Sequence, residues 1–325
     1  MAEWIYEAGI GENRAVLIDD GVIIEAYVEP HSSDVRAGTI LPARLRANRI
    51  AEMDSGVEAL LDAVPAKLTE GAPIRIEVTR EALSEPGKAK RAKARLVPPD
   101  SEIREGPTLL ERISSSGFRV AQVSPHDPDR LEECGWSECL EQATSGDIRG
   151  EQVSLRISLT PAMTLIDVDG TFPPLILAIE GVKAAAAAIT RFGLSGSIGL
   201  DLPTLESKAE RVLAAAALRG GPLRSPFEAT AINGFGFMQI IVPRRRASLC
   251  ELLQYDRAGA QARALLRRAQ RSGWSGSMTL VVPPRVGSVL AEKPDWLNEL
   301  ARHCGGAVSL RIDPQLAMEA GYVQA

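Results

Sequence analysis

The chain has 325 residues, of which 45% are hydrophobic and 24% are charged, and its formal net charge is −5. This length is sufficient for two or three compact units, and the composition is ordinary for a globular protein. The negative net charge argues against a protein that binds nucleic acids over its whole surface, although a local basic patch can still do so.

Two absences narrow the class of protein further. The sequence has no apolar run of 18 or more residues, and its first residues lack the pattern of a signal peptide. The four cysteines have irregular spacing and form no Cys-x-x-Cys pair, which favours reduced structural thiols. We therefore expect a cytoplasmic protein that has no membrane segment.

The first 36 residues predict a β-meander. Alternating apolar residues indicate strands over residues 4–8, 14–18 and 22–28. Asp19-Asp20-Gly21 lies between the last two and is a strong signal for a hairpin turn.

Residues 37–99 predict a small β-rich insert, with strands over 38–46 and 72–79 and an end at Pro98-Pro99. Basic residues crowd its second half: Lys88, Lys90, Arg91, Lys93 and Arg95. Two interpretations stay open, a solvated loop and a surface that contacts the phosphates of a nucleic acid. Residues 107–116 and 128–143 then predict helices that flank a strand at 118–123.

Residues 153–203 contain the most informative pattern. Strands are expected over 153–159, 163–169 and 197–202, and a helix over 175–192 lies between the last two. Asp167 and Asp169 are two apart on one strand, so both should point to the same face, roughly 7 Å apart.

Asp201 lies near the end of the following strand. If the two strands are neighbours, three carboxylates gather at one edge of a sheet, and their repulsion calls for a divalent cation or shared protons. The alternative is that each aspartate is a helix cap, a turn residue or a solvated charge.

The rest of the chain predicts more alternating elements. A helix capped by Thr204 should run to residue 218, and strands should follow over 227–232 and 237–242. The tract Arg244-Arg245-Arg246 comes next and is suited to bidentate contacts with phosphate oxygens.

The last 75 residues predict a compact α+β unit. It comprises an arginine-rich helix over 252–271, a strand over 278–282, a helix over 296–304 and a strand over 307–312.

The stretch around Asp167 resembles the catalytic region of the ribonuclease E/G family. The family motif is Thr-x-Ala-x-x-x-Ile-Asp-x-Asn, which Thr160, Ala162, Ile166 and Asp167 match, and a second family aspartate falls at Asp201. The resemblance implies that these two aspartates hold one magnesium ion. The family asparagine that assists them is replaced here by Asp169.

The resemblance also implies an α+β domain organisation. Residues 1–36 and 100–150 would form an RNase H-like part, 37–99 a reduced OB-fold that binds RNA, 151–249 a DNase I-like catalytic part, and 250–325 a small C-terminal α+β domain. The chain lacks the family's zinc-binding Cys-x-x-Cys and an evident sensor of a 5′-monophosphate. A homodimer stays open.

A shorter match points elsewhere. Residues 165–171, Leu-Ile-Asp-Val-Asp-Gly-Thr, resemble the first motif of haloacid-dehalogenase-like phosphatases, in which the first aspartate is a nucleophile and the second a general acid and base. The match covers seven residues and the later acidic motif of that class is missing, so the resemblance that covers most of the chain is preferred.

The sequence therefore predicts a magnesium-dependent endoribonuclease that cleaves single-stranded RNA. Asp167, Asp201 and Asp169 are the expected catalytic residues, and the first two are the expected metal ligands. The expected RNA-binding residues are Lys88, Lys90, Arg91, Lys93, Arg244, Arg245 and Arg246. The main alternative is a non-catalytic RNA-binding protein of the same fold.

Overall fold

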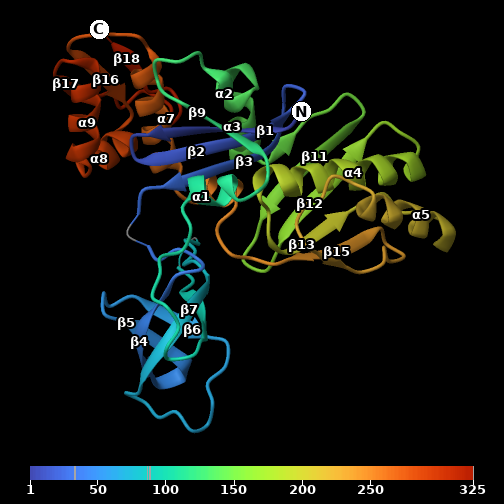
Figure 1. Cartoon of the computed structure of the whole chain (residues 1–325). Coiled ribbons are helices and arrows are strands. Elements are labelled where there is room, and N and C mark those ends of the chain that lie inside the picture. Colours follow the sequence, from blue (N-terminus) through green and yellow to red (C-terminus); the bar gives the residue numbers. More distant parts are fainter. Residues whose placement is uncertain (33, 86, 88, 325) are drawn as a thin grey trace. The chain divides into compact units, whose positions relative to one another are not determined.

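The computed structural model describes the whole chain apart from residues 33, 86, 88 and 325 (Figure 1). The chain forms two compact units. Unit 1 comprises Met1–His31, Gly117–Ser145 and Leu252–Ala325, and unit 2 comprises Ser32–Ser116 and Gly146–Glu251. Both contain sheets and helices, so the expected mixed α+β class is confirmed.

Unit 1 contains a four-stranded sheet of order β3-β2-β1-β9. Three strands form the predicted meander, β1 (Glu3–Gly9), β2 (Glu12–Asp19) and β3 (Val22–Pro30), and β9 (Arg119–Val123) pairs with β1 in parallel. Asp20 and Gly21 both have positive φ, which is the backbone that the expected hairpin turn requires.

The helix expected over residues 128–143 is in fact two helices. They are α2 (Arg130–Glu133) and α3 (Trp136–Ser145). Gly135 between them has φ +85°, a left-handed conformation that ends the first helix, so the prediction of one continuous helix was wrong.

The C-terminal part of unit 1 contains helices and a small sheet of order β17-β16-β18. The strands are β16 (Met278–Val282), β17 (Val308–Ile312) and β18 (Tyr322–Gln324). The helices are α6 (Leu249–Tyr255), which begins in unit 2, α7 (Arg257–Arg271), α8 (Pro284–Ala291) and α9 (Pro294–Cys304). The single helix expected over 252–271 is broken because Asp256 caps a new helix, its carboxylate accepting from the backbone N–H of Gly259.

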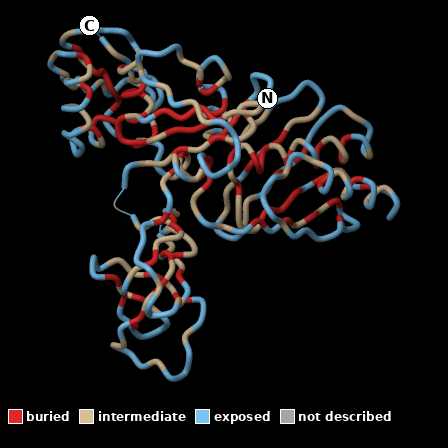
Figure 2. Tube along the Cα trace, viewed as in Figure 1, coloured by how far each residue is buried: buried red, intermediate tan, exposed pale blue. Residues whose placement is uncertain are grey.

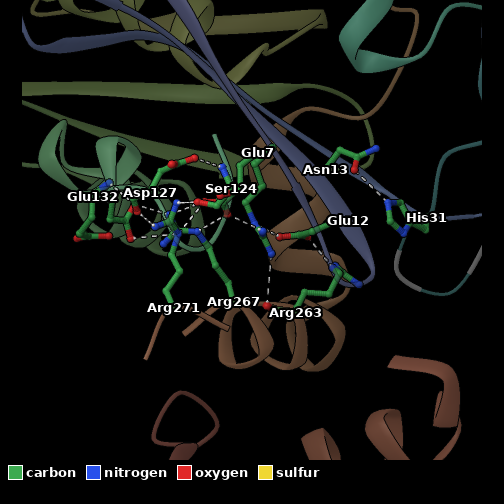
Figure 3. A network of polar contacts seen from close by, with 12 residues as sticks. Glu7, Glu12, Asn13, His31, Ser124, Asp127, Glu132, Arg263, Arg267 and Arg271 are labelled. Carbon is green, nitrogen blue, oxygen red and sulfur yellow. Dashed lines mark hydrogen bonds and ion pairs between the residues drawn. The ribbon is translucent and has the colours of Figure 1, made fainter. Parts of the chain in front are cut away.

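A network of buried ion pairs joins the meander to α7 (Figure 3). Arg14 on β2 is 1% exposed and donates to Glu7 Oε1 at 3.0 Å. From α7, Arg267 and Arg271 also donate to Glu7, at 2.7 and 2.8 Å. Arg263 reaches Glu12 Oε2 at 2.7 Å. The arginine-rich face of the helix is therefore largely buried.

This arrangement lowers the pKa of Glu7. Burial alone would raise the pKa, but the hydrogen bond and charge of Arg267 and the charges of Arg14 and Arg271 outweigh burial. A carboxylate whose pKa is lower in the folded state stabilises the fold above its unfolded pKa, and this stabilisation is lost as the pH falls through the folded value.

Unit 2 contains a closed barrel of order β4-β5-β6-β8-β7. Its strands are β4 (Ile40–Arg46), β5 (Ile50–Met53), β6 (Glu58–Leu61), β7 (Pro73–Arg80) and β8 (Ala92–Leu96), with a 3₁₀ turn η1 (Ala47–Arg49) after β4. Its interior holds small and aliphatic side chains such as Ala51, Ala59, Leu61 and Ile76, all fully buried. A short helix, α1 (Leu109–Ser114), follows with a capping box from Thr108 and Glu111.

The second part of unit 2 is a six-stranded sheet of order β10-β11-β12-β13-β15-β14. The strands are β10 (Asp147–Ile148), β11 (Val153–Leu159), β12 (Thr164–Gly170), β13 (Gly196–Asp201), β14 (Glu228–Ala229) and β15 (Phe237–Val242). The strand expected over residues 227–232 is reduced to two residues. Beyond these two residues the regular strand pairing ends, and the side-chain hydroxyl of Thr230 accepts a hydrogen bond from the backbone N–H of Gln239.

Two helices accompany this sheet, α4 (Pro174–Phe192) and α5 (Lys208–Arg219). α4 packs on the face that carries Ile166 and Val168, and Gly181 leaves room for Val168, which a Cβ there would meet at 2.4 Å. Burial is accordingly concentrated in the strands and in the inner face of α4 (Figure 2). α5 is capped by Ser207 and not by Thr204 as expected, because Ser207 and Glu210 form a capping box.

Among the residues that the structure describes, no helix combines the length and the apolar character that crossing a membrane requires.

The buried network predicts a large and pH-dependent effect of Glu7. Glu7→Gln should lower the free energy of unfolding by about 3–5 kcal/mol, since it leaves buried guanidinium groups without their carboxylate. The wild type should also lose stability as the pH falls through the range in which Glu7 titrates, and the variant should lose less. Chemical denaturation between pH 3 and 7 measures both, with the exposed Glu141→Gln as the control. Equal stability of the two variants would contradict the account.

Candidate acidic active site

Three aspartates lie at one end of the six-stranded sheet. β12 and β13 are parallel neighbours, and their register pairs Asp167 with Asp201. Asp169 lies two residues beyond Asp167 on the same face of β12, and all three side chains are exposed. The expectation that these strands lie side by side is confirmed. The three carboxylates occupy the face opposite α4, which covers Ile166 and Val168.

Local sequence fixes the ends of both strands. At Gly170, where β12 ends, a Cβ would lie 2.2 Å from Gln152 O and 2.6 Å from Leu177, so only glycine allows the chain to turn there toward α4. Beyond β13, Leu202 N donates to Gly236 O at 3.2 Å. Gly236 has φ +89° and lies so close to Leu202 that a side chain would collide with its carbonyl.

The charges at this site repel one another. Partial burial, Asp169 and Asp201 all raise the pKa of Asp167, and the hydrogen bond from Val168 N and the charge of Arg156 only partly oppose them. Arg156 is the cross-strand partner of Asp167 on β11 and also bonds Asp147 at 3.2 Å. A cation bound nearby would stabilise the charged form of a carboxylate whose pKa is raised in this way.

The residues fit a divalent cation in chemistry and in charge. Carboxylate oxygens are the ligands that Mg²⁺ prefers, and Mg²⁺ commonly takes only one or two from a protein while keeping several waters. Asp167 and Asp201 are the pair placed to supply them. Across the described part of the chain, no group of three or more His, Cys, Asp or Glu side chains is placed so that it could hold a metal ion.

The face that carries the aspartates combines covered and partly exposed positions. Gly199 on β13 leaves room for Phe237 and Leu165, which a Cβ there would meet at 2.6 and 2.9 Å. Gln239 on β15 donates to Ser197 Oγ at 2.8 Å on the same face. Leu165 and Ile241 are 37% and 41% exposed there.

The expected basic residues of the barrel lie largely in ion pairs. Lys90 pairs with Glu85 at 2.5 Å, and Arg91 pairs with Glu58 at 2.6 Å. Lys93 is half-buried on β8. Lys88 lies outside the described residues. Their role in RNA binding stays a prediction.

The arginine tract lies at the other end of the sheet from the aspartates. β13 and β15 are antiparallel, so Asp201 pairs with Phe237 while Gly196 pairs with Val242, two residues before Arg244. Five residue steps along a strand correspond to about 17 Å. Arg244 bonds Glu251, Arg246 pairs with Glu81 at 3.8 Å, and Arg245 is exposed. The structure thus does not bring this tract to the aspartates, and its contact with RNA stays a prediction.

Two features of the site were missed from the sequence. Arg156 was assigned only to an alternating strand, although its register partner is Asp167. The turn Asn233–Gly236 was expected between two strands, in a segment that resembles one of the ribonuclease E/G family, but the 86% exposure of its Phe235 was not anticipated. A glycine-flanked aromatic residue in a turn was the available signal.

A scan against models of protein families and a search of curated proteins gave no match to this chain. The resemblance described above therefore stays a prediction, and the argument for function depends on the site.

The raised pKa of Asp167 depends on its neighbours and can be tested directly. Asp201→Asn or Asp169→Asn should lower the pKa of Asp167, because each removes a negative charge that opposes its ionisation. Glu180→Gln is the matched control, since Glu180 lies on α4 and pairs with Lys183. Carbon-detected NMR titration of the carboxyl groups measures the shift. An unchanged Asp167 pKa in both variants would contradict the proximity of the three groups.

Proposed function

We propose that the protein is a magnesium-dependent endoribonuclease that cleaves single-stranded RNA, similar to ribonuclease E/G. The observation that carries the proposal is the parallel register that pairs Asp167 with Asp201 on an open sheet face. Clustered carboxylates at a surface are unfavourable without a cation, and RNA phosphate itself is repelled by them unless a cation lies between.

In the proposed cleavage reaction, a bound Mg²⁺ and the three aspartates have different roles. A bound Mg²⁺ stabilises charge that develops on the phosphate in the transition state and lowers the pKa of a bound water. Asp167 and Asp201 would hold the ion and would have to be ionised to do so. Asp169, exposed beside Asp167, accepts a hydrogen bond from the attacking water and orients it. Because protons compete with the cation, activity should fall as the pH falls through the raised pKa of Asp167.

Other parts of unit 2 support an RNA substrate. The closed five-stranded barrel over residues 40–96 is consistent with a reduced OB-fold, a fold that binds single strands through a basic groove. We likewise interpret the six-stranded sheet as DNase I-like and the meander of unit 1 as RNase H-like. The irregular spacing of the four cysteines, which form no Cys-x-x-Cys pair, supports a reducing compartment such as the cytoplasm. A homodimer stays a prediction.

One observation favours a second candidate, an RNA-binding protein that does not cleave. Two of the expected basic residues of the barrel, Lys90 and Arg91, are paired with glutamates, and within the described residues no group of three or more His, Cys, Asp or Glu could hold a metal ion. Binding alone, however, gives no reason for aspartates to face the phosphates, so we prefer the nuclease.

Substitution of the paired aspartates tests the proposal. Asp167→Asn and Asp201→Asn should each reduce Mg²⁺-dependent internal cleavage of a 5′-labelled AU-rich single-stranded RNA by about 10²–10³-fold. Asp169→Asn should reduce it by about 10–100-fold. Glu180→Gln should cleave like the wild type. The measurement is single-turnover cleavage resolved on a sequencing gel.

The pattern of outcomes separates the candidates. RNA that every variant binds and none cuts would favour the binding protein. Cleavage at the wild-type rate by Asp167→Asn and Asp201→Asn would show that the active site lies elsewhere.

A further inference from the structure

A groove runs along α5 in unit 2. Its two adjoining cavities have volumes of about 660 and 600 Å³ and share Arg219, Phe227 and Ala229. One side of the groove is α5, and the other is the irregular segment 227–234 that precedes β15. The helix has 12 residues and is therefore about 18 Å long.

The groove leads to the acidic end of the sheet. Lys208 starts α5 a few residues after Asp201, and Asn233 and Gly234 line the same cavity as Lys208. Asn233 N donates to Phe237 O at 3.0 Å, and Phe237 is the register partner of Asp201. The groove thus extends from Arg224 at one end to the turn at Asn233 and Gly234 at the other, and it lies on the α4 side of the sheet, because its lining residue Met238 pairs with the buried Leu200.

The charge of the groove is complementary to a polyanion. Its charged lining residues are Lys208, Arg211, Arg219 and Arg224 on the basic side and Glu228 alone on the acidic side. Arg219 and Arg224 are exposed. This excess contrasts with the net charge of −5 of the whole chain. A local excess of cations is the electrostatic signature of a phosphate-binding track.

The floor of the groove suits bases. Phe227 is half-buried between the two cavities, and Val212 on α5 is 59% exposed. Ile232 and Met238 complete an apolar surface below them. A groove that combines cations with aromatic and apolar contacts is the general form of a site for single-stranded nucleic acid.

Phe235 lies in the turn between the groove residues Asn233 and Gly234 and Phe237, the register partner of Asp201. Its turn is held by Asn233 Oδ1, which accepts from Phe235 N at 2.8 Å and from Phe237 N at 3.1 Å. Gly236 at positive φ packs against Leu202. The backbone is therefore fixed while the ring is 86% exposed, so its face is accessible for stacking on a base.

We propose that the α5 groove binds the segment of single-stranded RNA adjoining the cleaved bond, with phosphates on Arg219 and Arg224 and a base stacked on Phe235. The inference rests on the proposed function in naming the same RNA as the occupant. It assigns the substrate track to residues of α5 and its following loop rather than to the tract Arg244–Arg246.

Binding without cleavage tests the groove independently of catalysis. The probe is a 5′-fluorescein oligouridylate of about 12 nucleotides, bound to the full chain in EDTA at several salt concentrations. In Arg219→Gln/Arg224→Gln the slope of log Kobs against log salt should become shallower by about 1.4, since each lost phosphate contact on a single strand contributes about 0.7. The matched control, Arg119→Gln/Arg302→Gln, removes two exposed arginines of unit 1 and should keep the wild-type slope.

Phe235→Ala separates stacking from charge. It should weaken binding by about 5- to 150-fold while leaving the salt slope unchanged. Circular dichroism melting confirms that each variant folds. If a variant does not fold, the binding measurement on it is replaced by cross-linking of a 4-thiouridine oligonucleotide to the wild-type protein. Mass spectrometry should then place the adduct on peptides containing Phe227 or Phe235.

The outcomes distinguish failure of the groove from failure of the nuclease. Groove-dependent binding with no cleavage in Mg²⁺ would support the inference and overturn only the proposed catalysis. Cleavage by the wild type together with an unchanged slope in Arg219→Gln/Arg224→Gln, or adducts confined to other peptides, would overturn the groove alone. Light scattering that shows a dimer dissociated by Val212→Glu, with RNA binding unaffected, would assign the groove to a second copy and also overturn it.

Discussion

The parallel register of β12 and β13 is the constraint on which the candidate site depends. The register is fixed by burial, because Ile166 and Ile198 lie on the covered side of the sheet and are fully buried. A slip of one residue would move these side chains to the open face and turn Asp167 and Asp169 toward α4. The packing that stabilises unit 2 therefore also determines which way the carboxylates point.

The carboxylates of the two units lie in two different electrostatic environments. In unit 1, Glu7 and Glu12 are buried and bonded to arginines of β2 and α7, and the pKa of Glu7 is lowered. In unit 2, Asp167 is exposed, lies near two other aspartates and has a raised pKa despite the neighbouring Arg156. The first arrangement stabilises the fold. The second carries an electrostatic cost that a bound cation would remove, which is a common property of functional sites.

The sequence predicted what depends on local pattern. Alternation placed β11, β12 and β13, and the spacing of Asp167 and Asp169 placed both on one face. Sequence could also anticipate the turn at Asp20-Gly21, since only certain residues adopt positive φ readily.

The features that the sequence could not predict depend on contacts between residues that are far apart in the chain. The sequence showed only that the helix is rich in arginine, and only the fold shows that Glu7, more than 250 positions earlier, lies against these arginines. The tract Arg244–Arg246 follows β15 closely in sequence, yet antiparallel pairing carries it away from Asp201. The α5 groove arises because residues 227–234 form hardly any regular strand, which the apolar pattern of that segment did not indicate.

The central claim is that a divalent cation binds between the ends of β12 and β13. Ferrous iron can replace magnesium at an oxygen-ligand site and, with peroxide and ascorbate, generates hydroxyl radicals that cut the polypeptide locally. The account predicts cuts close to residues 167–169 and 201, suppressed by excess Mg²⁺ and absent from Asp167→Asn/Asp201→Asn. Cuts that are uniform along the chain, or that persist at these positions in the double variant, would contradict it.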